Sequence, residues 1–224
     1  KNVDAYNGLG NVYSELEKYD LALKNYERAM ELDPKYVYAY YNLGLLYKKL
    51  GEYDKARKNY ERAIELDPKY VNAYYNLGLL YINLDNYELA RKNWEKAIEL
   101  DPKYVNAYGN LANMYYNLQK YEEAKKNYEK VLEIDSNNVY AYNSLGNLYK
   151  KLGEYDLARK NYERAIEVDP KYVDAYYNLG LLYYEQKNYG ITCKNLEKVL
   201  ELDSNNVYAY NFLGSLYKKL GEYD

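Results

Sequence analysis

A 34-residue repeat runs through the chain, and this period restricts the possible folds more than any other feature of the sequence. The repeats begin at Val3, Val37, Val71, Val105, Val139, Val173 and Val207. Six full repeats cover residues 3–36, 37–70, 71–104, 105–138, 139–172 and 173–206, and the first helix of a seventh covers residues 207–224. A fixed period of roughly 20 to 50 residues is typical of stacked repeat arrays. We therefore expect residues 1–224 to form a single array.

Each repeat has the pattern of two amphipathic helices. In the repeat 71–104, Ala73, Leu77, Leu80 and Leu84 recur at helical spacing and form one apolar stripe of the first predicted helix. A short break at residues 85–87 separates it from the second helix, and Pro102 prevents that helix from continuing. One helix pair is too thin to bury both of its faces, so we expect consecutive pairs to stack.

Small and aromatic residues occupy fixed places in the repeat, where a place is counted from the starting valine. Place 8 is Gly78 and place 20 is Ala90 in the repeat 71–104. We expect these two residues to face each other where the helices approach most closely, which would offset the helix-propensity cost of glycine, about 1 kcal/mol. The aromatic residues Tyr81 and Trp94 are expected to fill the space around this contact.

The residues at these places match a known family. Place 7 is always leucine, place 11 is always tyrosine, and place 8 is glycine in every repeat except at Ala112. The pattern resembles the tetratricopeptide repeat (TPR) family, in which W-x2-L-G-x2-Y is followed by A-x3-F and P. This resemblance implies an all-α fold, a right-handed α-solenoid superhelix of antiparallel helix pairs. It also implies a non-catalytic scaffold that binds a protein or peptide.

The repeat 173–206 departs most from the pattern. Its second helix begins with Gly190 and Ile191, and Thr192 replaces the small alanine of the other repeats. Glycine and β-branched residues are less favourable than alanine in helices. Two interpretations remain open: a drifted repeat with looser packing, or a hinge or partner-binding element.

The composition excludes several kinds of reactive site. The chain has no histidine, which excludes a Ser-His-Asp triad and histidine ligands to a metal. It also has no glycine-rich phosphate loop. Glutamates recur three residues after a lysine, as Glu61 follows Lys58, and this is the spacing of a helix-surface ion pair. We predict no catalytic residue, no cofactor and no metal, so an enzymatic role would require this chain to be the substrate-recruiting region of a larger enzyme.

The resemblance also implies a binding surface. In the family, the first helices line a concave groove through places 2, 5, 6, 9, 12 and 13. Carried over to this chain, the predicted peptide-binding residues are Tyr38, Tyr41, Asn42, Lys48, Asn72, Tyr75, Asn76, Asn106, Asn110, Asn113, Tyr140, Asn143, Asn147, Lys150, Tyr177 and Asn178. These places vary between repeats while the packing places hardly change. The asparagines at place 6 resemble the ladder with which O-linked N-acetylglucosamine transferase holds peptide backbones, whereas the carboxylate clamp of chaperone-binding members is absent.

The charge distribution suggests the character of the partner. The predicted groove face carries ten lysines and four acidic residues, although the whole chain has a net charge of −3. A positive groove on an acidic body would attract an extended, acidic peptide segment. Alternatively, these lysines only solvate the helix ends. The acidic balance and the scarcity of arginine argue against a nucleic-acid partner.

The remaining expectations concern location and assembly. No stretch of about 18 apolar residues is present, so we expect no membrane span. Cys193 is the only cysteine, which favours a reducing compartment and hence the cytoplasm. The chain runs from Lys1 to Asp224, within a repeat, and both ends are expected to be cut from a longer protein. Without a polar capping helix, the end faces could stack into a homo-oligomer, and a self-assembling solenoid is the alternative function.

Overall fold

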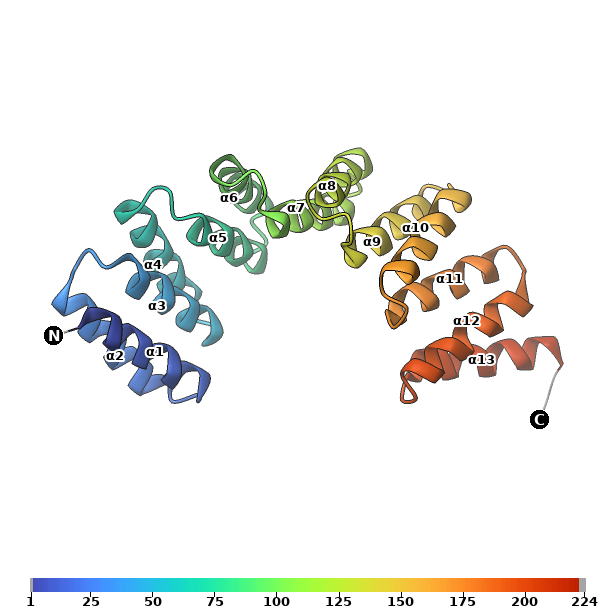
Figure 1. Cartoon of the computed structure of the whole chain (residues 1–224), viewed down its shortest axis with the longest axis horizontal. Helices are drawn as coiled ribbons and strands as arrows, with labels where there is room; N and C mark the ends of the chain where they lie inside the picture. Colours follow the sequence, from blue (N-terminus) through green and yellow to red (C-terminus); the bar gives the residue numbers. More distant parts are fainter. Residues whose placement is uncertain (1, 222–224) are drawn as a thin grey trace. The chain divides into compact units, whose positions relative to one another are not determined.

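The structure, a computed structural model, describes residues 2–221 as a succession of α helices (Figure 1). Lys1 and residues 222–224, which include the end of the predicted seventh repeat, lie outside the described residues. The described part contains thirteen helices and no strand. The helices are α1 (Val3–Glu15), α2 (Tyr19–Leu32), α3 (Val37–Lys49), α4 (Tyr53–Leu66), α5 (Val71–Asn83), α6 (Tyr87–Leu100), α7 (Val105–Asn117), α8 (Tyr121–Ile134), α9 (Val139–Lys151), α10 (Tyr155–Val168), α11 (Val173–Glu185), α12 (Tyr189–Leu202) and α13 (Val207–Leu220).

The helix boundaries follow the repeat. Every first helix begins at the valine that was predicted to start a repeat, and every second helix of the six full repeats begins at a tyrosine. The two helices of a repeat run antiparallel and pack against each other (Figure 1). The predicted all-α solenoid of antiparallel helix pairs is therefore confirmed. None of the helices within residues 2–221 is long and apolar enough to cross a lipid bilayer.

The turn within each helix pair requires one residue in the left-handed region. Gly51 and Gly153 supply it in two repeats, with φ of 76° and 80°. Non-glycine residues take this conformation in the other four full repeats, for example Asp85 with φ of 53° and Lys187 with φ of 60°. An L side chain in this region costs roughly 1–2 kcal/mol. These four turns are therefore held by the packing of the helices that they join.

An aspartate organises the turn between repeats. Oδ1 of Asp67 accepts a 2.9 Å hydrogen bond from the backbone N–H of Lys69, and Oδ1 of Asp135 accepts one of 3.2 Å from Asn137. Such Asx turns let a short polar side chain replace a backbone acceptor. Where Asn138 ends the turn, its Oδ1 also accepts from Ala141 N–H at 3.0 Å and caps α9. The polar turns expected between repeats are thus present.

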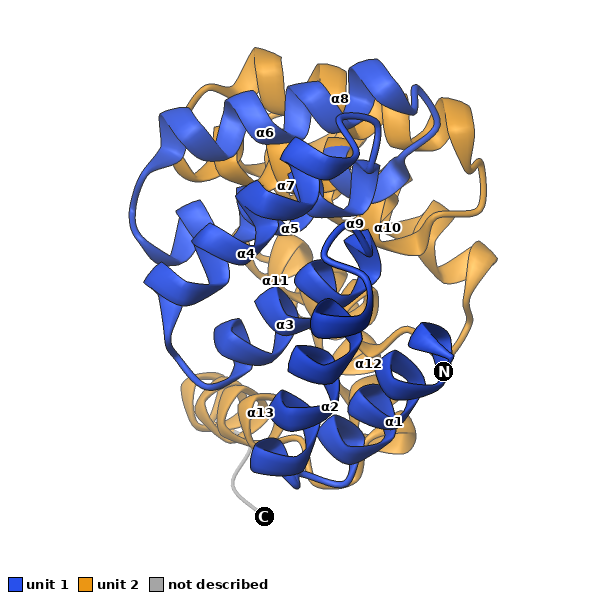
Figure 2. Cartoon of the chain, turned by 90° about the vertical axis from the view of Figure 1, so that its left-hand side faces the viewer, with its two compact units in different colours: residues 1–107 blue, residues 108–224 orange. Residues whose placement is uncertain are grey.

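The chain divides into two compact units, residues 1–107 and residues 108–224 (Figure 2). Within unit 1, α1 to α6 form three stacked helix pairs, and within unit 2, α9 to α12 form two pairs with α8 and α13 packed on either side. In each unit the first helices of neighbouring repeats also touch one another. One continuous array over residues 1–224 stays a prediction.

The glycine at place 8 makes room for an aromatic ring. A Cβ built on Gly78 would lie 2.4 Å from Nε1 of Trp94, and one built on Gly146 would lie 2.4 Å from Cε1 of Tyr162. A Cβ built on Gly10 or on Gly44 would also be too close to the ring opposite it, with nearest distances of 2.4 and 2.6 Å. Whether Gly78 also faces Ala90 stays a prediction. The ring of the second helix needs more space than a methyl group and takes the position nearest to the glycine.

The repeat 173–206 has a different packing at this contact. Leu196 replaces the aromatic residue, and a Cβ on Gly180 would lie 3.4 Å from Leu196 Cγ, which is ordinary van der Waals contact. Thr192 is fully buried, and its hydroxyl donates a 3.0 Å hydrogen bond to Asn188 O. Helix α12 is 14 residues long, as are the other second helices, for example α10. A hinge at this repeat stays a prediction.

Candidate functional site

The predicted groove residues all lie on first helices, which adjoin one another within each unit. In unit 1 they are Tyr38, Tyr41, Asn42 and Lys48 on α3, Asn72, Tyr75 and Asn76 on α5, and Asn106 on α7. In unit 2 they are Asn110 and Asn113 on α7, Tyr140, Asn143, Asn147 and Lys150 on α9, and Tyr177 and Asn178 on α11. We call these two sets the groove face of each unit. The residues on α3 and α5 in unit 1, and those on α9 and α11 in unit 2, lie on first helices that contact each other.

Hydrogen bonds connect the groove faces of consecutive repeats. Nδ2 of Asn42 donates to Oδ1 of Asn7 at 2.9 Å, and Nδ2 of Asn178 donates to Oδ1 of Asn143 at 3.0 Å. Each bond joins place 6 of one repeat to place 5 of the repeat before it. The N–H groups of these asparagines are therefore used between repeats, which leaves their Oδ1 atoms as the acceptors that a partner could reach.

Asn76 follows the same rule with a different acceptor. Its Nδ2 donates to the hydroxyl of Tyr41 at 3.0 Å and to Asn72 O at 3.0 Å. Asn76 is buried, as is Asn143. The sequence places these residues on the right helix face, but it gives no sign that their side chains join repeats. A comparison of the residue at place 5 of each repeat with the residue at place 6 of the next repeat could have revealed these hydrogen bonds.

Tyrosine rings form edge-to-face contacts on the groove face of unit 1. The ring centroids of Tyr41 and Tyr70 are 5.1 Å apart with an interplanar angle of 88°, and those of Tyr38 and Tyr70 are 5.7 Å apart at 90°. Tyr75 and Tyr104 make a similar contact at 5.1 Å. Such contacts fix the rings and add stability beyond area burial. Tyr70 and Tyr104, at the last place of their repeats, are part of this surface and were not among the predicted residues.

Unit 2 repeats the arrangement with Tyr140 and Tyr172, whose centroids are 5.5 Å apart at 83°. Tyr140 remains 68% exposed and Tyr38, its counterpart in unit 1, 52% exposed. Each of these rings offers a large apolar contact area to a partner. Each repeat with an Asp-Pro turn ends in a tyrosine, and this recurring tyrosine was the feature of the sequence that could have predicted the second ring, Tyr70 or Tyr172.

Three groove asparagines hold buried tyrosines of the second helices. The hydroxyls of Tyr26, Tyr128 and Tyr162 donate to Oδ1 of the asparagine at place 9 in the same repeat, over distances of 2.9, 2.7 and 2.8 Å. The acceptors are Asn11, Asn113 and Asn147. Burial raises the pKa of Tyr26 and of Tyr128 to about 12. Asn113 and Asn147 therefore support the core from the groove face.

The second repeat lacks this acceptor because place 9 is Leu45, which packs against the cluster containing Tyr60. Tyr60 is fully buried, and its hydroxyl is the one buried side-chain polar atom without a hydrogen-bond partner among residues 2–221. In the third repeat, where place 9 is also leucine, Trp94 donates from Nε1 to Tyr75 O at 3.1 Å. Only the second repeat therefore buries an unsatisfied aromatic donor.

Shallow cavities open on the groove face of each unit. In unit 1 a cavity of about 330 Å³ is lined by α1 and α3 residues that include Asn11, Asn42 and Lys49. In unit 2 a cavity of about 150 Å³ is lined by Asn113, Tyr116, Tyr128, Ser144 and Asn147. Amide and hydroxyl groups line both cavities, and Glu15 also lines the cavity of unit 1.

The lysines of the groove face differ in their surroundings. Nζ of Lys150 lies 3.2 Å from Oε1 of Glu185. Lys48 is half-buried and makes no ion pair with any residue from 2 to 221. Burial lowers the pKa of Lys48 because the charged ammonium is less well solvated.

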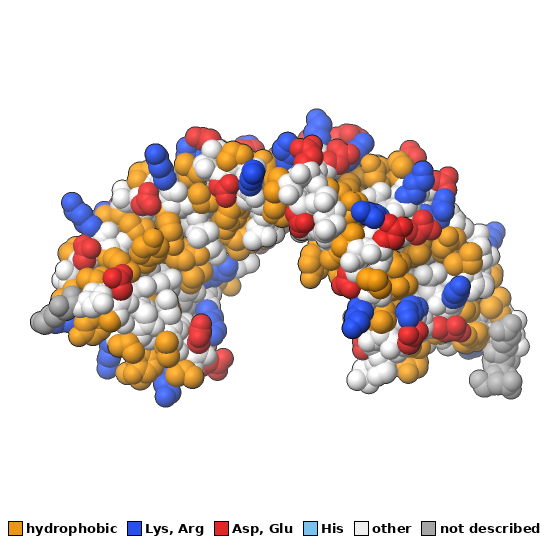
Figure 3. Space-filling model, viewed as in Figure 1, with side chains coloured by type: hydrophobic (Ala, Val, Ile, Leu, Met, Phe, Trp, Pro, Cys, Tyr) orange, Lys and Arg blue, Asp and Glu red, His pale blue; other side chains and the backbone are white. Residues whose placement is uncertain are grey.

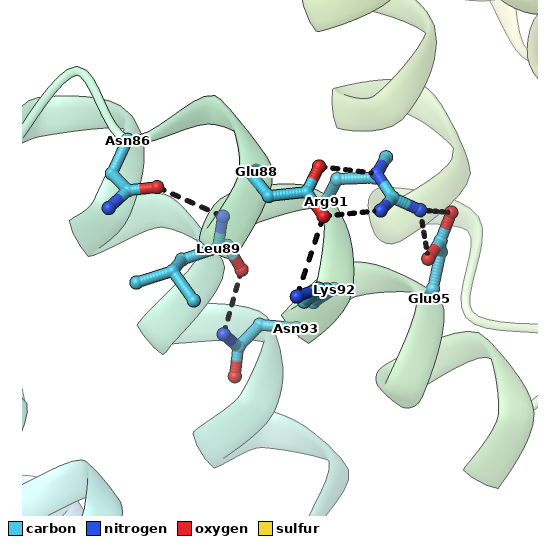
Figure 4. Close-up of polar contacts among 7 residues, drawn as sticks. All are labelled: Asn86, Glu88, Leu89, Arg91, Lys92, Asn93 and Glu95. Atoms are coloured by element: carbon cyan, nitrogen blue, oxygen red, sulfur yellow. Dashed lines mark hydrogen bonds and ion pairs between the residues drawn. The ribbon is translucent and has the colours of Figure 1, made fainter.

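Charged side chains are also interspersed over the second helices (Figure 3), where most of the ion pairs lie within one helix. On α6, Arg91 donates to Glu88 and to Glu95, each at 2.7 Å (Figure 4). The hydrogen bond from Arg91 lowers the pKa of Glu88. The expected pairs with a lysine three residues earlier are replaced by pairs four residues apart, because Arg57, not Lys58, contacts Glu61. In the described part of the chain, no three His, Cys, Asp or Glu residues are grouped so that they could hold a metal ion.

Comparisons with known proteins agree with this geometry. Family models described as tetratricopeptide repeat match residues 3–69, 71–104, 93–126 and 173–206, and a model described as TPR repeat matches residues 112–153 and 146–187. No curated protein matches the sequence. Repeats of this family typically form non-catalytic modules that bind other proteins.

Several solved structures share the fold. The crystal structure of YrrB, a TPR protein with an unusual peptide-binding site, matches with a TM-score of 0.65 at 24% identity, over 84% of this chain and 97% of that chain. PilF of Pseudomonas aeruginosa matches with a TM-score of 0.78 at 21% identity, over 95% and 97% of the two chains. PilW, a type IV pilus biogenesis factor, also has a TM-score of 0.78, at 17% identity and over 94% and 98% of the chains. With one kind of repeat model matching from Val3 to Asn206 and helices in the same register, the chain belongs to the tetratricopeptide repeat family.

Proposed function

We propose that this protein-interaction scaffold binds an extended peptide segment of a partner protein along its groove face and catalyses no reaction. The observation that carries the proposal is the pair of exposed tyrosines, Tyr38 and Tyr140, each fixed by a second ring behind it. Rigid aromatic rings provide large contact areas at a small entropic cost. Each unit therefore offers one such point of attachment.

The backbone of the bound segment would be held by amide oxygens. In Asn42, Asn76 and Asn178 the Nδ2 group is already bonded to the neighbouring repeat, so the side chain cannot rotate freely. Its Oδ1 is therefore presented in a fixed direction and can accept a hydrogen bond from a peptide N–H. Fixed acceptors lower the entropy that binding costs.

The partner is proposed to be acidic and to be a protein, not a nucleic acid or a membrane. The support is the excess of lysine on the groove face of a chain whose net charge is −3. We further propose a reducing compartment, the cytoplasm, because the chain has a single cysteine. The same groove could recruit substrates if the chain belonged to a larger enzyme.

A selection from a random displayed-peptide library on the immobilised chain tests the proposal. We expect the selected peptides to lose about tenfold in affinity when Tyr38 and Tyr140 are both changed to Ser, as expected for losing two aromatic contacts. The matched control is Tyr87→Ser with Tyr155→Ser, which removes two similarly exposed tyrosines from the second helices α6 and α10. Equal affinity of the groove variant and the control variant would refute the proposal.

Self-association is the second candidate, and the exposed face of α1 favours it. Leu9 and Val12 are 44% and 50% exposed, whereas the equivalent Leu43 and Leu46 on α3 are 5% and 1% exposed. No second helix among residues 2–221 covers this stripe, and two copies could bury it symmetrically against each other. Light scattering should then show a dimer that Val12→Lys dissociates. A mass that stays monomeric as concentration rises would exclude this candidate.

A further inference from the structure

The contrast between Lys48 and Lys150 distinguishes the two units. The two lysines lie at place 12 of their repeats, in the identical local sequence Leu-Tyr-Lys-Lys-Leu-Gly-Glu-Tyr-Asp. Both are half-buried near the end of a first helix, α3 or α9. Their own helices differ at uncharged residues such as Leu45 and Asn147, and the charge that distinguishes the two lysines comes from the next repeat.

The next repeat differs at place 13. In unit 2 this place is Glu185 on α11, and its carboxylate lies 3.2 Å from the ammonium of Lys150. In unit 1 the same place is Asn83 on α5, which carries no charge. Contacts between place 12 and place 13 of the next repeat recur, since Nζ of Lys219 donates to the hydroxyl of Tyr184 at 3.2 Å. Asn83 is thus the residue positioned to pair with Lys48, and it cannot form an ion pair.

A half-buried ammonium without a counter-charge favours an incoming anion. The ammonium of Lys48 has lost part of its hydration, so attraction to a carboxylate is stronger there than at a fully exposed lysine. The neighbouring cation does not compete for the same position, because Nζ of Lys49 lies 5.1 Å from the ring centroid of Tyr19 on α2. Lys150 gains nothing comparable, since a ligand would have to displace Glu185.

We propose that Lys48 binds a carboxylate of the peptide segment and that place 13 of the next repeat, Asn83 or Glu185, decides which unit accepts the acidic residue. The inference rests on the proposed function, since it assumes a peptide lying along the first helices. It predicts where the acidic residue of a bound segment lies, because Lys48 in unit 1 has no counter-charge whereas Lys150 in unit 2 is paired with Glu185. In unit 2, Glu185 acts as a built-in substitute for that carboxylate.

The test follows each lysine separately by NMR of its side-chain Cε group while hexaglutamate is added. We expect the Lys48 signal to shift and the Lys150 signal to stay in place. Asn83→Glu should weaken the Lys48 response about fivefold, and Glu185→Asn should create a response at Lys150, as expected for losing or gaining one charge-assisted contact. Both changes are at exposed positions, and circular dichroism confirms that the variants remain folded.

Two outcomes would overturn the inference: an equal response of Lys48 and Lys150 in the unaltered protein, or an unchanged Lys48 response in Asn83→Glu. Hexaglutamate with an amidated C-terminus separates the two sources of the carboxylate, a side chain or the chain end. Failure of this inference is distinguishable from failure of the proposed function. Library peptides that depend on Tyr38 and Tyr140 but leave Lys48 unaffected would overturn the inference alone.

Discussion

The hydroxyl of Tyr162 donates a 2.8 Å hydrogen bond to Oδ1 of Asn147, whereas the equivalent hydroxyl of Tyr60 has no partner because Leu45 takes the place of the asparagine. The two tyrosines occupy the same place in their repeats and are equally buried. They therefore form a matched pair for measuring what one buried hydrogen bond contributes.

Removing the two hydroxyls should have opposite effects. Tyr162→Phe breaks a hydrogen bond, and we expect the free energy of unfolding to fall by about 1 kcal/mol. Tyr60→Phe removes a buried donor that has no acceptor, and we expect it to rise by up to about 1 kcal/mol. Urea denaturation of both variants provides the measurement. A loss of stability in Tyr60→Phe as large as in Tyr162→Phe would show that the Tyr60 hydroxyl has a partner.

Adding a methyl group at place 8 should distinguish two kinds of repeat. Gly78→Ala places a Cβ 2.4 Å from Trp94, and we expect a loss of about 2 kcal/mol from overpacking. Gly180→Ala meets Asn195 and Leu196 at 3.4 Å, which is ordinary van der Waals contact, and we expect a gain of about 0.5 kcal/mol from better helix propensity. Chemical denaturation measures both. Similar losses in the two variants would contradict the role assigned to the aromatic ring.

The left-handed turn residues offer a way to stabilise the chain. Lys187→Gly relieves an L residue at φ of 60°, and we expect a gain of about 1 kcal/mol and a higher Tm. Gly153→Ala, at φ of 80°, should cost about the same amount. Thermal unfolding followed by circular dichroism measures both changes. A lower Tm for Lys187→Gly would mean that the flexibility of glycine in the unfolded chain outweighs the relief of strain.

Alkaline pH should unfold the chain through its buried tyrosines. Burial raises the pKa of Tyr26 and Tyr128 from 10.0 to about 12 in the folded protein. The neutral phenol is favoured in the fold, so this contribution to stability is fully present below pH 10 and is lost as the pH rises from about 10 to about 12. Phenolate absorbance and helical circular dichroism should change together over this range. Ionisation of all tyrosines near pH 10 without loss of helix would refute the prediction.

Much of the fold could be predicted from the period. The starting valines set every first helix, and the Asp-Pro and Asp-Ser-Asn-Asn segments set the turns between repeats. Because the pattern recurs seven times, the assignment of helices and turns in one repeat can be checked against the others. Periodicity places Trp94 near Gly78 but does not show that its ring comes closest to the glycine, because a period shows which residues share a face and not which atoms meet.

The groove face could be predicted only as a set of places. The sequence did not show which of these side chains form hydrogen bonds within the protein. Asn76 donates to Tyr41, 35 residues away, and Asn147 accepts from Tyr162 on the other helix of its repeat. The supporting rings of Tyr70 and Tyr172 were missed because they end one repeat while they contact the first helix of that same repeat. These contacts depend on how side chains pack between helices, which the sequence pattern alone does not show.

The bond from place 6 to place 5 of the preceding repeat has a consequence for how such genes change length. The place-6 amides of Asn42, Asn76 and Asn178 each donate to place 5 of the preceding repeat, as Asn42 donates to Asn7. Excision of residues 37–70 would bring Asn76 beside Asn7 and recreate the same amide pair. Recombination in whole multiples of the period therefore keeps place 6 next to place 5 at the new junction, and the bond returns wherever place 6 is asparagine and place 5 offers an acceptor.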